Sequence, residues 1–385
     1  MAPKPLLSAA SALAAASALR TDGQTAHLIQ GTEDKPIQLG QTQIFVVQFA
    51  GGDVWAVRIA VHQDSTLSPD SVSDLVQQEA ATIAKLNEAG FRWAPKLVGA
   101  VPSFDNPLSY PYMVVSWLPG AALEWSPSAL ADEQRHRILC QLAEIQLELA
   151  QCTIETSTEA LAQQHLVGIV GSKVSRVMNG TLPEVDLRSC FVLRALLRKA
   201  VCMESPLLAL THSNLAAHKI IVDADCNITG IVDWKLACVR PLEVTLQFPR
   251  LLAVEPDEAD ASPTENPSVA SIQRPPELAT DRQVFLSRLS SISSRESPLS
   301  SLAATMNTIL SDPNVDWKHL IIQSCFSRGI HRWMSERSWL VEGLERDVVL
   351  TVHDQAGQVV RAEIDDLVRS EPDWGFTREE LLQSL

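Results

Sequence analysis

The stretch from Leu210 to Trp234 reads LTHSNLAAHKIIVDADCNITGIVDW and decides the fold. Its pattern predicts a short loop, a strand over 219–223, a polar turn over 224–227 and a second strand over 228–232. The second strand leads directly into Asp233, so the expected hairpin begins beside a histidine-containing loop and ends at a carboxylate. A carboxylate at the end of a buried strand can hold a hard cation such as Mg²⁺, and it can equally cap the turn that follows.

This hairpin resembles the catalytic segment of the aminoglycoside phosphotransferase and choline kinase family. In that family the loop reads approximately H-G-D-L-H-x-x-N-I-L-V-D, and G-I-I-D-W follows it. Two positions depart from the pattern, because Asn214 stands in place of the catalytic aspartate and Lys219 in place of the metal-binding asparagine. The resemblance implies a metal-binding role for Asp233. The matching positions are His212, Leu215, Ile220, Val222, Asp223, Gly230, Ile231, Asp233 and Trp234.

The N-terminal part of the chain is rich in predicted strands. Two β-rich runs, over 41–49 and 54–61, flank a Gly-Gly turn and predict an antiparallel hairpin. Two further strands are expected over 94–100 and 111–117, and the second of them leads into Leu118-Pro119-Gly120. The resemblance implies that this last segment is the hinge at which adenine binds.

A basic and an acidic residue follow each other in kinase order. Arg58 lies on the second strand of the expected hairpin, at the position of the family's phosphate-contacting lysine. A helix is predicted over 71–89, with Ser71 as its N-cap and Gly90 as its stop. The resemblance implies that Glu79, in the middle of this helix, pairs with Arg58 beside the nucleotide. The alternative for Glu79 is a solvated carboxylate on a helix surface.

The remaining nucleotide contacts are implied by the resemblance alone. The backbone of Ser116 and Leu118 is expected to face adenine, with Val115 behind it. The loop that covers the phosphates has one suitably placed glycine, Gly40, so we expect a weak cradle of backbone N–H groups there.

The rest of the chain predicts a mainly helical region. Glu255 to Pro276 and Arg288 to Ser301 are rich in Ser, Pro and acidic residues, and we expect a flexible insertion over 255–301. We therefore predict an α+β, two-lobed, protein-kinase-like fold with a small antiparallel N-terminal lobe over 1–119 and a larger helical C-terminal lobe over 120–385. The C-terminal lobe is expected to carry the catalytic segment 210–234. Helices are predicted over 127–152, 187–202, 302–310, 317–344, 361–369 and 377–385, with a less regular segment over 172–179; Trp317, Trp333 and Trp339 are expected in the core rather than at an acceptor site.

Composition excludes some partners. The chain has 385 residues and a net charge of −15, so it offers no basic field for nucleic acid. Its seven cysteines form no C-x-x-C pair, which favours reduced thiols in an intracellular compartment, and we expect a cytoplasmic protein. The alanine-rich segment 1–20 is compatible with a helix of the N-terminal lobe or with a targeting peptide. No run reaches the ~20 apolar residues that span a bilayer, so no membrane partner is expected.

The two departures from the family pattern, Asn214 and Lys219, fall on positions that take part in phosphoryl transfer in that family. Phosphoryl transfer from ATP depends on positioning and on charge neutralisation. Asn214 cannot accept a proton at neutral pH, and general-base catalysis contributes roughly 10²–10⁴ in rate. Lys219 places an ammonium where an amide would ligate the second metal ion, although it can neutralise phosphate directly. His218 is an alternative base that strand alternation argues against, since neighbouring strand residues face opposite sides. His212 is expected to fix the loop by hydrogen bonding.

The main functional expectation is therefore an aminoglycoside-phosphotransferase-like protein with a degenerate active site, acting as a pseudokinase-like binding or accessory protein. ATP and Mg²⁺ are its expected cofactors, with a weakened second metal site, and a small molecule its ligand, with a protein partner if it is a pseudokinase. One alternative is an active ATP-dependent phosphotransferase acting on a hydroxyl of a small molecule. Another is different chemistry on the acceptor side. Fold alone does not decide among them, so enzymatic activity stays open.

Overall fold

The chain forms two compact units, described here from a computed structural model. The structure describes residues 8–29, 36–39, 41–61, 68–126, 128–156, 162–201, 206–254, 256, 275–340, 356–371 and 375–385. The first unit comprises Met1–Thr153 and Thr211–Cys238, and the second comprises Ile154–Leu210 and Val239–Leu385. The first unit thus extends beyond the predicted boundary at residue 119 and includes the hairpin that carries the motif.

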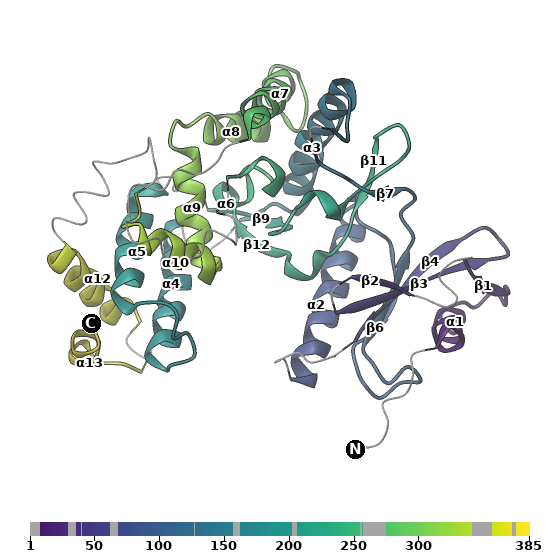
Figure 1. Cartoon of the computed structure of the whole chain (residues 1–385), viewed down its shortest axis with the longest axis horizontal. Coiled ribbons are helices and arrows are strands. Elements are labelled where there is room, and N and C mark those ends of the chain that lie inside the picture. Colours follow the sequence, from purple (N-terminus) through teal and green to yellow (C-terminus); the bar gives the residue numbers. More distant parts are fainter. Residues whose placement is uncertain are drawn as a thin grey trace. The chain divides into compact units, whose positions relative to one another are not determined.

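An antiparallel sheet is the centre of the first unit (Figure 1). Its strand order is β1-β3-β4-β6-β5, and β2 pairs with β3. The predicted hairpin over 41–61 is confirmed, because β3 and β4 pair from Thr42↔Ala60 to Gln48↔Val54. The strands are β1 (Ala26–Leu28), β2 (Ile37–Leu39), β3 (Thr42–Phe49), β4 (Val54–Ala60), β5 (Leu97–Val101) and β6 (Tyr112–Ser116).

Two helices pack on this sheet. Helix α1 (Ala9–Ser17) contacts β1, β3 and β4, and its residues Ala12, Ala15 and Ala16 are buried in the same core as Phe45. Residues 9–17 of the segment 1–20 thus form a helix that packs on the N-terminal sheet. Helix α2 (Pro69–Glu88) contacts β5 and β6.

The helix predicted over 71–89 begins earlier than expected. The prediction of Ser71 as N-cap is wrong, because the Ser68 side chain accepts the Ser71 N–H at 3.2 Å and Pro69 occupies the first turn. At its other end the chain leaves the helix at Gly90, as expected, in the left-handed region with φ +76°.

The motif stretch forms a small three-stranded sheet in the order β11-β10-β7. Strand β10 (Ile220–Val222) and strand β11 (Ile228–Ile231) are the predicted hairpin, and β7 (Ala121–Ala122) completes the sheet. The turn is closed by Asp223, whose Oδ1 accepts the N–H groups of Asp225 and Asn227. The first strand begins one residue later than predicted, since residues 217–219 form the 3₁₀ turn η1 (Ala217–Lys219). Helix α3 (Asp132–Thr153) contacts β11.

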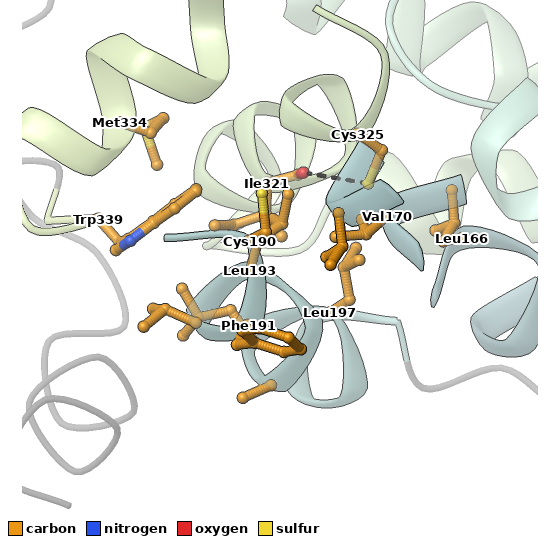
Figure 2. Close-up of a cluster of buried hydrophobic side chains, with 14 of the residues drawn as sticks. Leu166, Val170, Cys190, Phe191, Leu193, Leu197, Ile321, Cys325, Met334 and Trp339 are labelled. Carbon is orange, nitrogen blue, oxygen red and sulfur yellow. Dashed lines mark hydrogen bonds between the residues drawn. The ribbon is translucent and has the colours of Figure 1, made fainter. Parts of the chain in front are cut away.

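The second unit is mainly helical around a large apolar core. Figure 2 shows Leu166 and Val170 of α4, Phe191 and Leu193 of α5, and Ile321 of α9 within this core. A small sheet of order β12-β9-β8 accompanies the helices. Its strands are β8 (Glu155–Thr156), β9 (Leu207–Thr211) and β12 (Cys238–Pro241), and the helices are α4 (Ala162–Met178), α5 (Leu187–Ala200), α6 (Leu242–Thr245), α7 (Pro276–Ser293), α8 (Ser300–Leu310), α9 (Val315–Phe326), α10 (Arg328–Glu336), α12 (Ala356–Ser370) and α13 (Arg378–Gln383).

The expectation of a flexible insertion over 255–301 is wrong from residue 276 onward. Residues 276–293 form α7, which packs on α8. Phe285, Leu289 and Ile292 are buried at helical spacing, and serines lie between them in the sequence. The serine content concealed this apolar stripe. Residues 255 and 257–274 lie outside the described residues.

Other predictions about the helices had mixed outcomes. The segment predicted as irregular over 172–179 belongs to the regular helix α4. The continuous helix predicted over 317–344 is interrupted at Ser327, whose side chain caps α10 by accepting the Ile330 N–H; residues 341–350 lie outside the described ranges. The core placement of Trp317, Trp333 and Trp339 is confirmed, since all three are buried. Among the described residues, none of the helices has the length and apolar character to cross a membrane.

Candidate functional site

The predicted ion pair between β4 and α2 is present. The Arg58 Nη1 group donates to Glu79 Oε1 at 2.6 Å, and the two side chains are 14% and 7% exposed. Arg58 lies on β4, a central strand between β3 and β6, and its side chain reaches Glu79 on α2. The pair places a guanidinium where the resemblance expects the phosphate-contacting cation.

Glu79 also binds the backbone that follows the motif aspartate. Its Oε1 accepts the Trp234 N–H at 3.0 Å, and α2 packs on the 3₁₀ turn η2 (Trp234–Leu236). One carboxylate therefore joins strand β4, helix α2 and the segment that begins at Asp233. The sequence carries no signal for this bond, because every residue except proline has a backbone N–H.

The motif aspartate is engaged by a lysine. Lys219 Nζ lies 2.8 Å from Asp233 Oδ2, and Lys235 Nζ lies 3.5 Å from Oδ1. The side chains of Lys219 and Asp233 are 6% and 21% exposed, whereas that of Lys235 is 47% exposed. Burial opposes ionisation of Asp233, but the hydrogen bond from Lys219 and the charges of Lys235, Lys219 and Arg58 outweigh it and lower its pKa.

Local backbone geometry creates this contact. Lys219 ends the 3₁₀ turn η1, and Val232 donates its N–H to the Lys219 carbonyl at 3.0 Å. Asp233 has left-handed backbone angles, φ 69° and ψ 62°, which are uncommon for a residue other than glycine. Sequence reasoning placed both residues at the site but did not foresee that they bind each other.

The residues around Asp233 do not fit a divalent cation. A hard cation requires several oxygen ligands, and here the one carboxylate of the motif already has an ammonium at 2.8 Å. Over the ranges that the structure describes, no three His, Cys, Asp or Glu side chains are grouped so as to hold a metal ion. The ammonium of Lys219 therefore lies against the carboxylate to which the resemblance assigns a metal ion.

His212 fixes the loop, as expected. Its Nε2–H donates to the Val232 carbonyl at 3.0 Å, and its ring packs on Trp234 with the centroids 4.7 Å apart. Burial lowers its pKa to about 4, so the ring is neutral at pH 7. With the proton on Nε2, the buried Nδ1 is an acceptor, and it has no hydrogen-bond partner in the described structure.

Asn214 and His218 are the loop residues that the sequence associates with the acceptor side of the site. Asn214 is half-buried, directly after Ser213 with its positive φ of 62°, and its carbonyl accepts the Ala216 N–H at 3.0 Å. His218 is exposed while Lys219 is buried. The expected divergence of these two side chains is correct, but its reason is a 3₁₀ turn rather than strand alternation.

The hinge is held against the hairpin. The Ser116 N–H donates to the Lys96 carbonyl at 2.8 Å. This N–H is therefore engaged within the sheet, and the backbone group of Ser116 that stays a candidate for contact with adenine is its carbonyl oxygen. Leu118 lies against Gly230, where a Cβ would come within 2.5 Å of its side chain. Thr229 Oγ1 donates to the Pro119 carbonyl at 2.6 Å. Gly40, expected to cover the phosphates, lies outside the described residues.

An antiparallel sheet, a cation–carboxylate pair from strand to helix, and a hairpin ending on an aspartate define a kinase-like phosphotransferase fold. The model of the phosphotransferase enzyme family matches residues 35–244. The chain therefore belongs to the phosphotransferase enzyme family.

Three solved structures illustrate which proteins the chain is similar to. An ethanolamine kinase from Plasmodium vivax is 11% identical, with 91% of this chain and 88% of that chain covered and a TM-score of 0.45. Macrolide 2′-phosphotransferase MphH from Brachybacterium faecium is 16% identical, with 88% and 99% covered and a TM-score of 0.40. ADP-bound aminoglycoside phosphotransferase APH(2″)-Ib is 10% identical, with 91% and 97% covered and a TM-score of 0.47. No curated protein sequence matches this chain.

Proposed function

We propose that this protein is a pseudokinase-like member of its family, which binds a nucleotide or another phosphate-bearing small molecule without a metal ion. The observation that carries the proposal is the 2.8 Å contact between the Lys219 ammonium and the Asp233 carboxylate. This contact neutralises the carboxylate that would attract Mg²⁺ and puts a fixed positive charge in its place.

The phosphate-binding groups of the proposed site are Arg58 and Lys219. Arg58 is already oriented by Glu79, so little side-chain freedom is lost when an anion binds. Lys219 retains further N–H donors beyond the one that faces Asp233. The Ser116 carbonyl and the Leu118 N–H are the hinge groups that would bind a base.

Phosphoryl transfer is disfavoured at the acceptor side. ATP would supply a transferable phosphoryl group, but Asn214 has no proton-accepting carboxylate and His212 is held as a neutral ring against Val232. We propose that binding, with a role as an accessory protein to a partner, is the function that remains. The free thiols of the described cysteines support a reducing, cytoplasmic location for that role.

The alternative is an active ATP-dependent phosphotransferase that acts on a hydroxyl of a small molecule. The assembled Arg58–Glu79 pair and its link to Trp234 favour it, because this arrangement positions the phosphate end of a nucleotide. In that case Lys219 would stand in for the missing metal charge.

Thermal unfolding with ATP separates the two. Melting temperatures are measured with ATP in EDTA and with ATP plus MgCl₂, together with ATP turnover, for the wild type and for the Asn214→Asp, Lys219→Asn double variant. The matched control is Lys235→Asn, which removes the more exposed lysine beside the same carboxylate. We expect the wild type and the control to be stabilised equally in both buffers without turnover, and the double variant to require Mg²⁺.

Two results would contradict the proposal. Magnesium-dependent turnover by the wild type would establish the active enzyme instead. Absence of any stabilisation by ATP in the wild type, with stabilisation appearing in the double variant, would show that Lys219 blocks the site rather than serving it.

A further inference from the structure

A cavity in the second unit lies outside everything that the proposed function uses. Its volume is about 510 Å³, and α5, α12 and α13 supply its lining. Arginines from three parts of the chain meet there. The lining residues are Arg188, Gly357, Val360, Arg361, Arg378, Leu382 and Leu385.

Two of these arginines have no acidic partner among the described residues. Arg378 Nε donates to Asp365 Oδ1 at 2.5 Å. Arg188 and Arg361, by contrast, make no ion pair or side-chain hydrogen bond within the part of the chain that the structure describes. In a chain with 46 acidic and 31 basic residues, carboxylates to pair with them are abundant. The two charges face a shared cavity instead.

Other arginines at the contact between α5 and α12 are paired with carboxylates. Further along α5, Arg194 Nε lies 3.2 Å and Arg198 Nε lies 2.9 Å from the carboxylate of Glu363 on α12. Arg194 also binds Asp366, at 3.0 Å. The α5–α12 contact thus satisfies its inner arginines with carboxylates and leaves Arg188 and Arg361 to the cavity.

The cavity is built on a rigid frame. α5 packs on α12, and α12 packs on α13, as Figure 1 shows for these neighbouring helices. Ile364 and Leu367 of α12 and Leu381 of α13 are fully buried. A capping box between Thr377 and Glu380 fixes the start of α13. This packing fixes the backbone that carries Arg188 and Arg361, whose exposed side chains line the cavity.

We propose that this cavity binds a small oxyanion with two or more negative charges, through Arg188 and Arg361. The guanidinium fork matches the spacing of the oxygens in phosphate and carboxylate groups, and two such groups lining one cavity carry the charge that such an anion requires. Val360, Leu382 and Leu385 form an apolar wall for the body of such a ligand. Phosphate and carboxylate share this chemistry.

Calorimetric titration of the full chain tests the site. Pyrophosphate represents phosphates, and citrate represents carboxylates, each at about 50 mM salt so that exposed charges are little screened. The test variant is Arg188→Gln with Arg361→Gln. The control is Arg295→Gln with Arg369→Gln, which changes the net charge equally at exposed arginines that do not line the cavity. An Arg58→Gln variant removes the cation of the first-unit site without touching this one.

We expect saturable binding of at least one anion by the wild type, the control and the Arg58 variant, weakened at least about tenfold in the double variant. Preference for pyrophosphate assigns a phosphate ligand, preference for citrate a carboxylate ligand, and equal binding an oxyanion of either kind. Absence of binding by the wild type, or binding unchanged in the double variant, overturns the proposal. Loss of binding only in the Arg58 variant assigns the anion to the first unit and overturns it too.

Discussion

Two ion pairs of the first unit have similar components and opposite consequences. Arg58–Glu79 and Lys219–Asp233 each join a cation to a carboxylate, at 2.6 Å and 2.8 Å. The first keeps the arrangement expected of a kinase-like phosphotransferase. The second occupies the carboxylate at which a metal would bind. The Arg58–Glu79 pair thus has the arrangement expected of the family, whereas in the Lys219–Asp233 pair an ammonium engages the carboxylate of the motif.

The largest expected effect comes from breaking the first pair. Glu79→Ala removes the partner of Arg58 and the acceptor of the Trp234 N–H together. We expect the free energy of unfolding to fall by about 3–4 kcal/mol, because a buried cation and a buried N–H both lose their partner. Urea unfolding combined with hydrogen exchange of the peptide over residues 220–231 measures the effect in the first unit.

Glu79→Gln is the matched control for that change. It keeps an oxygen for the Trp234 N–H and loses only the charge, so we expect about half of the destabilisation. Equal effects of the two substitutions would show that the backbone bond contributes nothing.

Breaking the second pair is expected to have a somewhat smaller effect. Lys219→Met leaves Asp233 without its closest cation, although Lys235 remains at 3.5 Å and solvent reaches part of the carboxylate. We expect a loss of about 2–3 kcal/mol from the free energy of unfolding. Addition of Mg²⁺ should restore part of the loss, measured as a rise in melting temperature in the variant only. An increase in stability on substitution would mean that burying Lys219 is unfavourable overall.

Lowering the pH from 6.5 to 4 is expected to distinguish the contribution of His212 to the free energy of unfolding from the contribution of the ion pairs. The ring has a pKa of about 4 in the folded chain, so the unfolded chain binds a proton near pH 6.5 and the folded chain does not. The free energy of unfolding should therefore fall by about 2 kcal/mol between pH 6.5 and 4 on account of this residue, and level off below. Asp233 has a lowered pKa, so its contribution persists through this range and is lost only below about pH 4.

The measurement is the pH dependence of urea unfolding for the wild type and His212→Gln. His319 and His331, in the second unit, also have pKa values lowered by burial, to about 4 and 3, and they contribute equally to both proteins. The difference in slope therefore isolates His212. Parallel curves would show that His212 has the same proton affinity in both states.

The smallest expected effect tests whether Lys219 rather than Lys235 is the main partner of Asp233. Lys235→Ala removes a half-exposed lysine at 3.5 Å from Asp233, and we expect a change below about 0.5 kcal/mol in the free energy of unfolding. A loss as large as that of Lys219→Met would show that either lysine can hold the carboxylate. The same urea series measures both.

The fold was largely predictable because its signals are local. The hairpin over 41–61 and the strand pair that ends at Asp233 are readable from alternation, turn residues and spacing, and the pairing of Arg58 with Glu79 was implied by the family resemblance. The start of α2 was misplaced because Ser68 and Ser71 are both good caps, and only the folded chain shows which one is used. Helix α7 was missed because its four serines are as many as its four buried apolar residues and lie among them.

The site was predictable in its members but not in their contacts. Lys219 was expected to repel a metal, but its bond to Asp233 depends on a 3₁₀ turn and on left-handed angles at Asp233 that side-chain patterns do not encode. The Glu79 bond to a backbone N–H was likewise invisible, since it involves no particular residue type on the donor side.

The first unit is built from two separate stretches, Met1–Thr153 and Thr211–Cys238, and this affects how the chain is made. As synthesis proceeds from the N-terminus, the sheet and α3 emerge long before the hairpin that completes them. Gln141 of α3 then lacks the Ile228 N–H, and Glu79 lacks the Trp234 N–H. A nascent chain that has not yet reached Cys238 consequently exposes an unfinished surface of the first unit, and such surfaces favour chaperone binding and aggregation.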